Sequence, residues 1–513
     1  MFRTQLNIDK AFGQSSQHNL NFLAGAEWKQ NSRRSSSDAY LGFIEDTYSY
    51  AVINPRGSYN TIYGWDNYFS SNGSIAKNRD RALSYYSNAA FSAFNGKYVL
   101  SGSIRFDDFT LVGASRGERG KPLWSIGGKW DAKKEKFLKD VTWADALGLR
   151  LTYGVNGILP KSVGRVVVIN TSTDNISNEV TADIAYPANK QITWEKVKSL
   201  NVGLDYAIWN NRLQLNVDYY TKKSSDIVYS FPFNGTYGWT LLQFNSATLE
   251  GHGIDIGLRA AWLQSTVKWN TLFNFGYNTN KVTDSRFTDP VNVINYTNAS
   301  TPILGHPTDY LYAYRWAELD NQGRSQVYKK NGDIVNADAP ANALVAEDLV
   351  EMGRTTPPYV GGLFNTFSFK DFTLGVRATY EMGHVLRRLS VQNYPDYAGY
   401  SGAIGMQSDL AKRWRQPGDE AFTNVPGLST QGYQYNSLSR YANSDALVIS
   451  GSNIRLQQID LGYNFPFKTL EHTPSKSVNV NASVRNVGRI WRKNKDGADP
   501  SYRTLNSYSN IPP

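Results

Sequence analysis

Segments of about ten residues in which apolar and polar side chains alternate recur along the chain. In the first clear example the apolar positions are Leu20, Phe22, Ala24, Ala26 and Trp28, and the residues between them are mostly polar. A side-chain period of two is typical of a β-strand with two different faces. The same alternation begins again near Tyr98, Leu147, Leu200, Leu213, Ile254, Val267, Phe372, Ile459 and Val478. The pattern therefore predicts an all-β chain.

The connections between these segments alternate between short turns and long polar loops. The short turns lie near residues 13–17, 95–96, 210–211, 263–266 and 370–371. The long loops cover about 30–82, 157–195, 224–249 and 384–449. Large antiparallel transmembrane β-barrels of the outer membrane have this asymmetry, with short periplasmic turns, long extracellular loops and aromatic residues near the strand ends. A soluble β protein shows the same alternation of faces, so both classes stay open, but the loop lengths favour the barrel.

A membrane barrel keeps its short turns on one side, which constrains the number of strands. The turn at 370–371 falls on that side only if a further strand lies between residues 280 and 358. A hairpin with strands at 309–316 and 325–329 and a turn at 320–323 is the candidate, and it brings the count to about sixteen strands. The segment 132–146 then lies at the short-turn end, where its apolar positions predict a small amphipathic helix under the rim.

Composition narrows the class further. The chain has 33 Tyr, 23 Phe and 13 Trp, and only 19% of its residues are charged, which excludes a disordered protein. The mean hydropathy is −0.47, and no apolar run approaches the roughly 18 residues of a spanning helix. A barrel agrees with this low value, because every second residue of its strands faces a wet lumen.

Several kinds of chemistry are excluded by residue types that are absent or scattered. The chain has no Cys and only five His, so neither a thiolate site nor a histidine metal cluster is expected. The net charge of +10 has no basic tract behind it, which gives no support to nucleic-acid binding.

No catalytic constellation is present either. The glycines of 113–120 lack the ending of a phosphate loop, and the acidic turns at 320–323 and 496–499 do not continue into a calcium loop. Asp107 and Asp108 are adjacent on a strand and face opposite sides, so they do not flank one bond. We therefore expect neither an enzyme nor a cofactor.

Both ends of the chain are unusual. Met1 is followed at once by an alternating segment, 2–12, without the charged and apolar regions of a secretory signal, and the chain ends at Pro512-Pro513 after a polar stretch. The start leaves two interpretations open, a cytosolic protein or a missing beginning, and the end is typical of a cut inside a loop.

Specific motifs add a second argument. The stretches WEKVK, NVGLDY, NNRL and DYY, at 194–198, 201–206, 210–213 and 218–220, resemble the core of the SusC/RagA family of TonB-dependent outer-membrane transporters. Further stretches that resemble family motifs, in the family's order, are GHGIDI at 251–256 with His and Asp in place of the usual residues, RWRQPGDE at 413–420, GSNIRL at 451–456 with LGYNFP at 461–466, and Asn486 with Gly497, Asp499 and Pro500. The succession of motifs covers the whole chain.

The resemblance implies an outer-membrane protein whose complete barrel has 22 strands. Residues 1–513 would be a partial barrel domain holding roughly the sixth to the twenty-first strand, without the signal peptide, TonB box, plug domain, first strands and last strand. The family implies active import of oligosaccharides or peptides, a SusD-like surface lipoprotein as a lid, the TonB-ExbB-ExbD complex as the energy source, and contact with outer-membrane lipids. A self-contained passive porin of about sixteen strands, or a soluble secreted protein that binds or cleaves carbohydrate, is the alternative.

Candidate solute-binding residues come from the aromatics of the long loops, because aromatic faces stack on sugar rings and peptide side chains. They are Trp65, Tyr68, Tyr237, Trp239, Tyr397 and Trp414. For any one of them, packing within the loops or an interfacial position is the competing interpretation. Alternation assigns a second set to the lumen, where these residues would touch the plug or simply hydrate the interior, namely Arg105, Asp107, Arg150, Asp255, Arg259 and Arg377.

Overall fold

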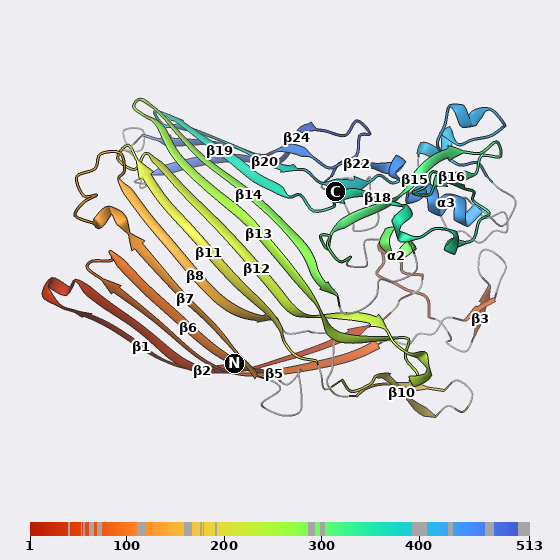
Figure 1. The fold of residues 1–513 in the computed structure, drawn as a ribbon, viewed down its shortest axis with the longest axis horizontal. Coiled ribbons are helices and arrows are strands. Elements are labelled where there is room, and N and C mark those ends of the chain that lie inside the picture. The colour runs from red at the N-terminus through yellow and green to blue at the C-terminus, as the bar shows by residue number, and fades with distance from the viewer. Residues whose placement is uncertain are drawn as a thin grey trace.

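The computed structural model describes the chain except for residues 39, 41, 53, 55–56, 61–65, 69–73, 110–119, 159–166, 175–176, 178, 190–191, 286–292, 298–302, 392–407, 429–433, 467–476 and 501–513. Its dominant element is a curved antiparallel sheet of 14 strands that neighbour one another in chain order (Figure 1). The strands are β1 (Phe2–Phe12), β2 (His18–Ser37), β5 (Ser74–Ala93), β6 (Tyr98–Phe109), β7 (Gly120–Asp131), β8 (Ala146–Ile158), β11 (Glu195–Ile208), β12 (Leu213–Pro232), β13 (Leu241–Gln264), β14 (Val267–Ser285), β19 (Tyr359–Phe369), β20 (Phe372–Met382), β23 (Asn453–Phe465) and β24 (Val478–Arg492). The predicted antiparallel β-barrel class is confirmed.

The short turns gather at one end of this sheet and the long loops at the other, as predicted (Figure 1). Residues 94–97 join β5 to β6, with φ of +53°, +56° and +79° at Phe94, Asn95 and Gly96. Residues 209–212 join β11 to β12, with φ of +59°, +54° and +61° at Trp209, Asn210 and Asn211. A run of residues with positive φ reverses the chain within a short loop, and Asn and Gly tolerate that conformation best. Side-chain chemistry at these turns therefore fixes where the strands reverse.

The strand count differs from the prediction at the 309–329 hairpin. Its strands do not join the main sheet, because β14 pairs directly with β19, from Val267 opposite Phe369 to Tyr277 opposite Tyr359. The connection between β14 and β19 is one long loop, so the turn at 370–371 lies at the short-turn end without further strands. The hairpin instead builds a separate sheet. Its first strand is buried on both faces from Leu311 to Tyr314, so that part needs protein packed against both sides, which lipid or a lumen does not supply.

The amphipathic helix predicted at 132–146 is not formed. A 3-10 turn at Ala132–Lys134 is followed by irregular backbone, and the apolar side chains of Phe137 and Trp143 are 71% and 55% exposed. The Lys133 ammonium donates to the carbonyl oxygens of Leu138 at 3.1 Å and Val141 at 2.6 Å. These two hydrogen bonds satisfy backbone carbonyl groups of the folded-back segment that would otherwise bond within a helix.

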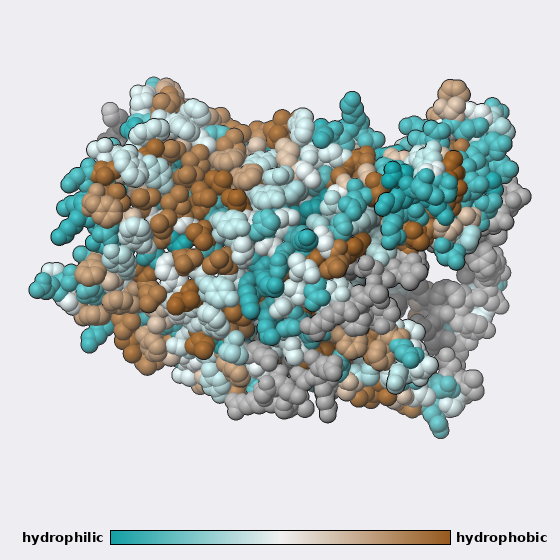
Figure 2. Space-filling view, in the orientation of Figure 1, coloured by the Kyte–Doolittle hydropathy of each residue, from teal (hydrophilic) through white to brown (hydrophobic). Residues whose placement is uncertain are grey.

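Two different faces run along the main sheet. One cross-strand row on the apolar face reads Leu151, Val202, Tyr219, Ile254 and Tyr277, on β8, β11, β12, β13 and β14. The adjacent row on the polar face reads Arg150, Gly203, Asp218, Asp255 and Gly276 on the same strands. Hydrophobic residues gather over the strands on the short-turn side of the molecule, and hydrophilic residues predominate toward the long loops (Figure 2).

The smaller elements lie in the long loops. They are the pairs β3 (Ser58–Asn60) with β4 (Asp66–Tyr68), β9 (Val168–Thr173) with β10 (Val180–Tyr186) and β21 (Val385–Arg387) with β22 (Val448–Ser450), the sheet of β15 (Tyr310–Leu319), β16 (Ser325–Tyr328), β17 (Ile334–Val335) and β18 (Leu349–Arg354), and the helices α2 (Val293–Thr297) and α3 (Gln434–Ala442). Single 3-10 turns occur at Gln14–Ser16, Gly235–Tyr237, Ala341–Ala343, Ala346–Asp348, Ser408–Lys412, Asp419–Ala421 and Asp445–Leu447. In the described part of the chain, no helix has the length and apolar character needed to cross a membrane.

The two longest loops fold together into what we call the loop cap, the described residues of 293–354 and 385–447. The cap has two hydrophobic clusters. The first consists of Val293, Tyr296, Tyr312, Tyr314, Val327, Val335, Leu344 and Leu349, and the second of Val391, Val425, Leu438, Tyr441 and Leu447. Because burial of one large apolar side chain is worth about 1.5 to 3 kcal/mol, these clusters give the cap a core of its own.

Candidate functional site

The polar face of the main sheet carries a network of charges across four neighbouring strands. The guanidinium of Arg150 contacts Asp205 through two nitrogens, both at 3.1 Å, and Asp218 at 3.0 Å. Lys129 lies 3.9 Å from the Asp205 carboxylate, and Asn216 donates to it at 2.7 Å. Two acids held by one arginine form a polar cluster joined by charge-assisted hydrogen bonds.

Gly203 makes room for this network. A Cβ atom at Gly203 would lie 2.7 Å from Cζ of Arg150 and 2.7 Å from a carboxylate oxygen of Asp218, closer than side chains approach one another. Beside the network, a shallow pocket of about 340 Å³ has Ser101, Gly127, Lys129, Arg150 and Asn201 among its lining residues. Small residues thus leave a hollow next to the charged groups.

The other residues assigned to the lumen also lie on the polar face. Arg105 donates to Asp107 at 2.7 Å and to Ser84 at 2.9 Å, so these three residues form a second polar group on β5 and β6. Asp255 lies opposite Asp218.

The remaining two residues assigned to the lumen, Arg259 and Arg377, lie in one cross-strand row. Arg259 pairs with Leu272, which pairs with Phe364, which pairs with Arg377, so the row crosses β13, β14, β19 and β20. The guanidinium of Arg377 stacks 4.9 Å above the ring of Phe364.

Sequence reasoning missed Lys129, Asp205, Asn216 and Asp218 as partners of Arg150. Alternation places all four on the same face as Arg150, which is a usable signal. Whether they contact Arg150 depends on the register of neighbouring strands, which alternation does not give. Lys129 lies opposite Arg150, whereas Asp205 lies opposite Gly148, two residues away.

The aromatic candidates have different surroundings. Tyr237 is 66% exposed, with its ring 5.6 Å from that of Phe233, and Trp239 is half-buried in the same loop. The backbone of Tyr68 pairs with Ser58 in the small β3–β4 hairpin. Trp65 and Tyr397 lie outside the described residues.

Trp414 packs inside the loop cap. A Cβ atom at Gly323 would lie 2.4 Å from its ring and one at Gly427 2.6 Å from it, so both glycines leave space for the indole. The indole nitrogen donates to Glu420 at 2.9 Å, and this hydrogen bond lowers the pKa of the Glu420 carboxyl. The motif RWRQPGDE therefore folds a turn of the cap around its own tryptophan.

Next to this turn the cap has a pocket of about 450 Å³. Its lining residues are Arg388, Asp409, Ala411, Lys412, Arg413, Arg415, Asp419, Phe422, Thr423, Asn424, Val425 and Tyr441. Four of them are Lys or Arg and two are Asp, and Phe422 is 91% exposed at its edge. The pocket therefore presents cationic side chains and one exposed aromatic ring.

Asp409 is a buried residue in the lining of this pocket. It accepts hydrogen bonds from Arg388 and, at 2.7 Å, from Ser390, whose hydroxyl also lies 2.9 Å from that of Tyr441. Burial alone would raise the pKa of the Asp409 carboxyl, but the bonds from Arg388 and Ser390 outweigh burial and hold the pKa below its ordinary value of 3.8.

The stability of the cap is therefore expected to depend on pH through Asp409. A carboxyl with a lowered pKa stabilises the folded state fully above its unfolded value, and this contribution is lost as the pH falls through 3.8 and then through the folded value. Limited proteolysis of the cap in the full-length protein across this range would measure the loss. Asp409→Asn should be less stable near neutral pH and should show a flatter acid dependence, whereas the exposed control Asp333→Asn should behave like the wild type. An equally steep acid dependence in Asp409→Asn would contradict the assignment.

Comparison with known proteins agrees with this architecture. No family model matches the chain. It is 25% identical to TonB-dependent receptor P3 of Formosa agariphila, over 98% of this chain and 49% of that protein. It is 24% identical to TonB-dependent receptor SusC of Bacteroides thetaiotaomicron, over 80% of this chain and 41% of that protein.

A solved structure of the RagAB peptide transporter superposes with a TM-score of 0.73 at 20% identity, covering 97% of this chain and 52% of that one. The resemblance to SusC/RagA proteins, the barrel fold and the outer-membrane location predicted from it are thereby confirmed. These relatives are receptors and transporters rather than enzymes, in agreement with the expectation. The chain spans about half the length, or less, of the curated relatives it matches.

Proposed function

We propose that this chain forms the barrel wall and outer loops of a SusC/RagA-like importer, which takes up oligosaccharides or peptides across the outer membrane. The observation that carries the proposal is the contrast between the two faces of one sheet, together with a folded cap at the long-loop end. The apolar face suits lipid. The polar face, with Arg150, Asp205 and Asp218, suits the wall of a wet lumen.

In this proposal a solute first meets the loop cap and then the polar face. The cationic cap pocket and the exposed rings of Phe422 and Tyr237 would hold it by charge and stacking. Arg105, Asp107, Asp255, Arg259 and Arg377 would extend the polar lining. Trp65, Tyr68, Trp239 and Tyr397 stay proposed contacts. Trp414 would act by shaping the cap.

The partners follow from the same family. A SusD-like surface lipoprotein would close over the cap, and the TonB-ExbB-ExbD complex would supply energy. Because the matched relatives are about twice as long, we propose that residues 1–513 are a partial barrel domain and that the contacts with TonB lie outside them. A peptide cargo is supported by the likeness to the RagAB peptide transporter, and an oligosaccharide cargo only by the resemblance noted in the sequence.

Uptake in cells tests the proposal. A strain without the full-length gene and its complemented parent would be offered fluorescent oligopeptides and, separately, fluorescent malto-oligosaccharides, with and without a protonophore. We expect gene-dependent uptake of one class that disappears when the proton gradient is collapsed. Gene-dependent uptake that survives the protonophore would indicate a passive porin and overturn active import. Accumulation of the protein in the medium instead of the outer membrane would indicate a soluble binding protein.

A further inference from the structure

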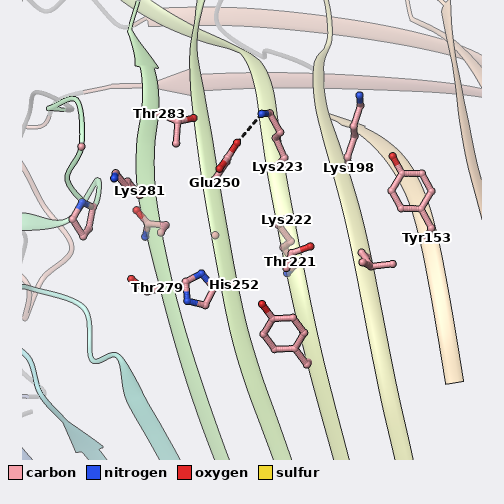
Figure 3. A pocket seen from close by; sticks show the side chains of 16 residues that line it. Tyr153, Lys198, Thr221, Lys222, Lys223, Glu250, His252, Thr279, Lys281 and Thr283 are labelled. Atoms are coloured by element: carbon pink, nitrogen blue, oxygen red, sulfur yellow. Dashed lines mark hydrogen bonds and ion pairs between the residues drawn. The ribbon is translucent and has the colours of Figure 1, made fainter. Parts of the chain in front are cut away.

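A row of lysines crosses the apolar face of the main sheet at its long-loop side. Lys198 of β11 lies opposite Lys223 of β12, Lys223 lies opposite Glu250 of β13, and Glu250 lies opposite Lys281 of β14. Their side chains stand next to one another on adjacent strands (Figure 3). We call these four residues the basic row.

The basic row lies where the apolar band ends. Along β11 the residues of this face, from the short turn outward, are Ile208, Tyr206, Leu204, Val202, Leu200 and then Lys198. From Ile208 to Lys198 is ten residues, which at about 3.3 Å per residue and a strand tilt of about 40° corresponds to roughly 25 Å of height. This equals the height of the lipid-facing band of outer-membrane barrels, so the lysines reach the level of the outer headgroups.

The charges of the basic row are not balanced by the row itself. Lys223 pairs with Glu250 at 2.6 Å, and Glu250 is the single acid among three lysines. The next acid outward on β12, Asp226, pairs with Lys196 at 2.9 Å. Two like charges directly opposite each other, as Lys198 and Lys223 are, destabilise a sheet. An anion bound between the two lysines would offset their repulsion.

A pocket supplies the space for such an anion. It measures about 800 Å³, and its lining includes the three lysines of the basic row. Tyr153, His252 and Thr279 stand in the next cross-strand row toward the short turns, and Tyr219 stands in the row after that. Residues Gly305 and Pro307, from the loop bonded to Val282, border it at the β14 side. Lysines at the outer end of this face, with Leu200 and Tyr219 farther toward the short turns, match a molecule that has an apolar body and an anionic head.

We propose that the basic row binds the phosphate group of an outer-leaflet lipid, with the acyl chains on the apolar strands below. Lys198 and Lys281 would supply the charge that Glu250 does not neutralise, and Lys223 would remain shared between Glu250 and the phosphate. This inference uses the orientation of the barrel in the outer membrane and not the import activity, so import and lipid binding can fail separately.

Native mass spectrometry of the purified full-length protein in detergent tests the proposal. The probes are lipid A with one phosphate, the same lipid without phosphate, and inorganic phosphate. The variant is Lys198→Gln with Lys281→Gln, which keeps the ion pair of Lys223 and Glu250. The control is Lys136→Gln with Lys139→Gln, which removes two exposed lysines at the short-turn end.

We expect the wild type and the control to prefer the phosphorylated lipid. The variant should bind it about thirtyfold more weakly, because each lysine near a lipid surface contributes roughly fivefold. Equal affinity of the wild type for the two lipids, or unchanged affinity in the variant, would overturn the proposal. Tight binding of inorganic phosphate to the same lysines would also overturn it, in favour of a site for the free anion. Far-UV circular dichroism of the variant ensures that a loss of binding is not a loss of folding.

Discussion

Replacing Arg354 by methionine is expected to destabilise the loop cap by about 3 to 5 kcal/mol, the usual result of removing one partner of a buried ion pair. Arg354 is 8% exposed. Its guanidinium contacts the Asp309 carboxylate at 3.0, 3.1 and 3.2 Å and donates to the carbonyl oxygen of Asn278 at 2.6 Å. One side chain thus joins β18, the residue before β15 and the outer part of β14. The variant leaves the Asp309 carboxylate, whose side chain is only 17% exposed, without its charge partner.

Hydrogen exchange of the full-length protein measures this effect locally. Protection of β15 and β18 should fall in Arg354→Met, while protection of the main sheet near Ile256 stays unchanged. Arg315→Met is the matched control, because Arg315 is an exposed arginine on β15. If Arg354→Met keeps full protection of both strands, the ion pair does not hold the cap to the sheet.

Replacing Ile256 by arginine is expected to cost about 2 to 4 kcal/mol of folding free energy in lipid, if Ile256 lies near the midplane. Its cross-strand row reads Leu149, Leu204, Val217, Ile256 and Phe275, near the middle of the apolar band. Urea titration of the full-length protein in lipid vesicles would measure the loss. An arginine here must remain in hydrocarbon or distort the bilayer to reach water.

Asp255→Arg is the matched control for this variant. It places the same side chain one residue away on the polar face, opposite Asp218, where an ion pair can form. We expect this control to fold with nearly wild-type stability. A control that fails while Ile256→Arg folds normally would mean that the two faces are reversed.

The main sheet was largely predictable because each of its strands separates an apolar environment from a polar one. Its side chains therefore alternate between apolar and polar. That Ile254 and Tyr277 stand on the apolar face follows from alternation alone, and the turns at 95–96 and 210–211 follow from their Asn and Gly. The register that pairs the two residues does not follow from alternation. The length of the strands was less predictable. β13 runs from Leu241 to Gln264, well beyond the alternating segment that begins at Ile254, because it stays paired with β12 as far as Pro232 opposite Leu241.

The loop cap could not be predicted, and the reason is the range of its contacts. The backbone of Trp316 donates to Asp445, 129 residues away, and the hydroxyl of Ser437 accepts from the backbone of Ser325. Periodicity describes one segment at a time and does not identify partners at such distances. For this reason the strand at Tyr310–Leu319 was correctly expected as a strand but placed in the wrong sheet.

The separate core of the loop cap has a consequence for how such proteins diverge. The cap is inserted through two pairs of neighbouring strands, β14 with β19 and β20 with β23, and its two clusters are made of residues from the inserted loops. Because none of these cluster residues lies on a strand of the main sheet, we expect substitutions there to repack the cap and to leave the register of the barrel strands unchanged. In the proposed importer, selection for a new cargo could therefore rebuild the entrance while the wall is inherited intact, and we expect a cap transplanted at the ends of these four strands to fold on the new wall.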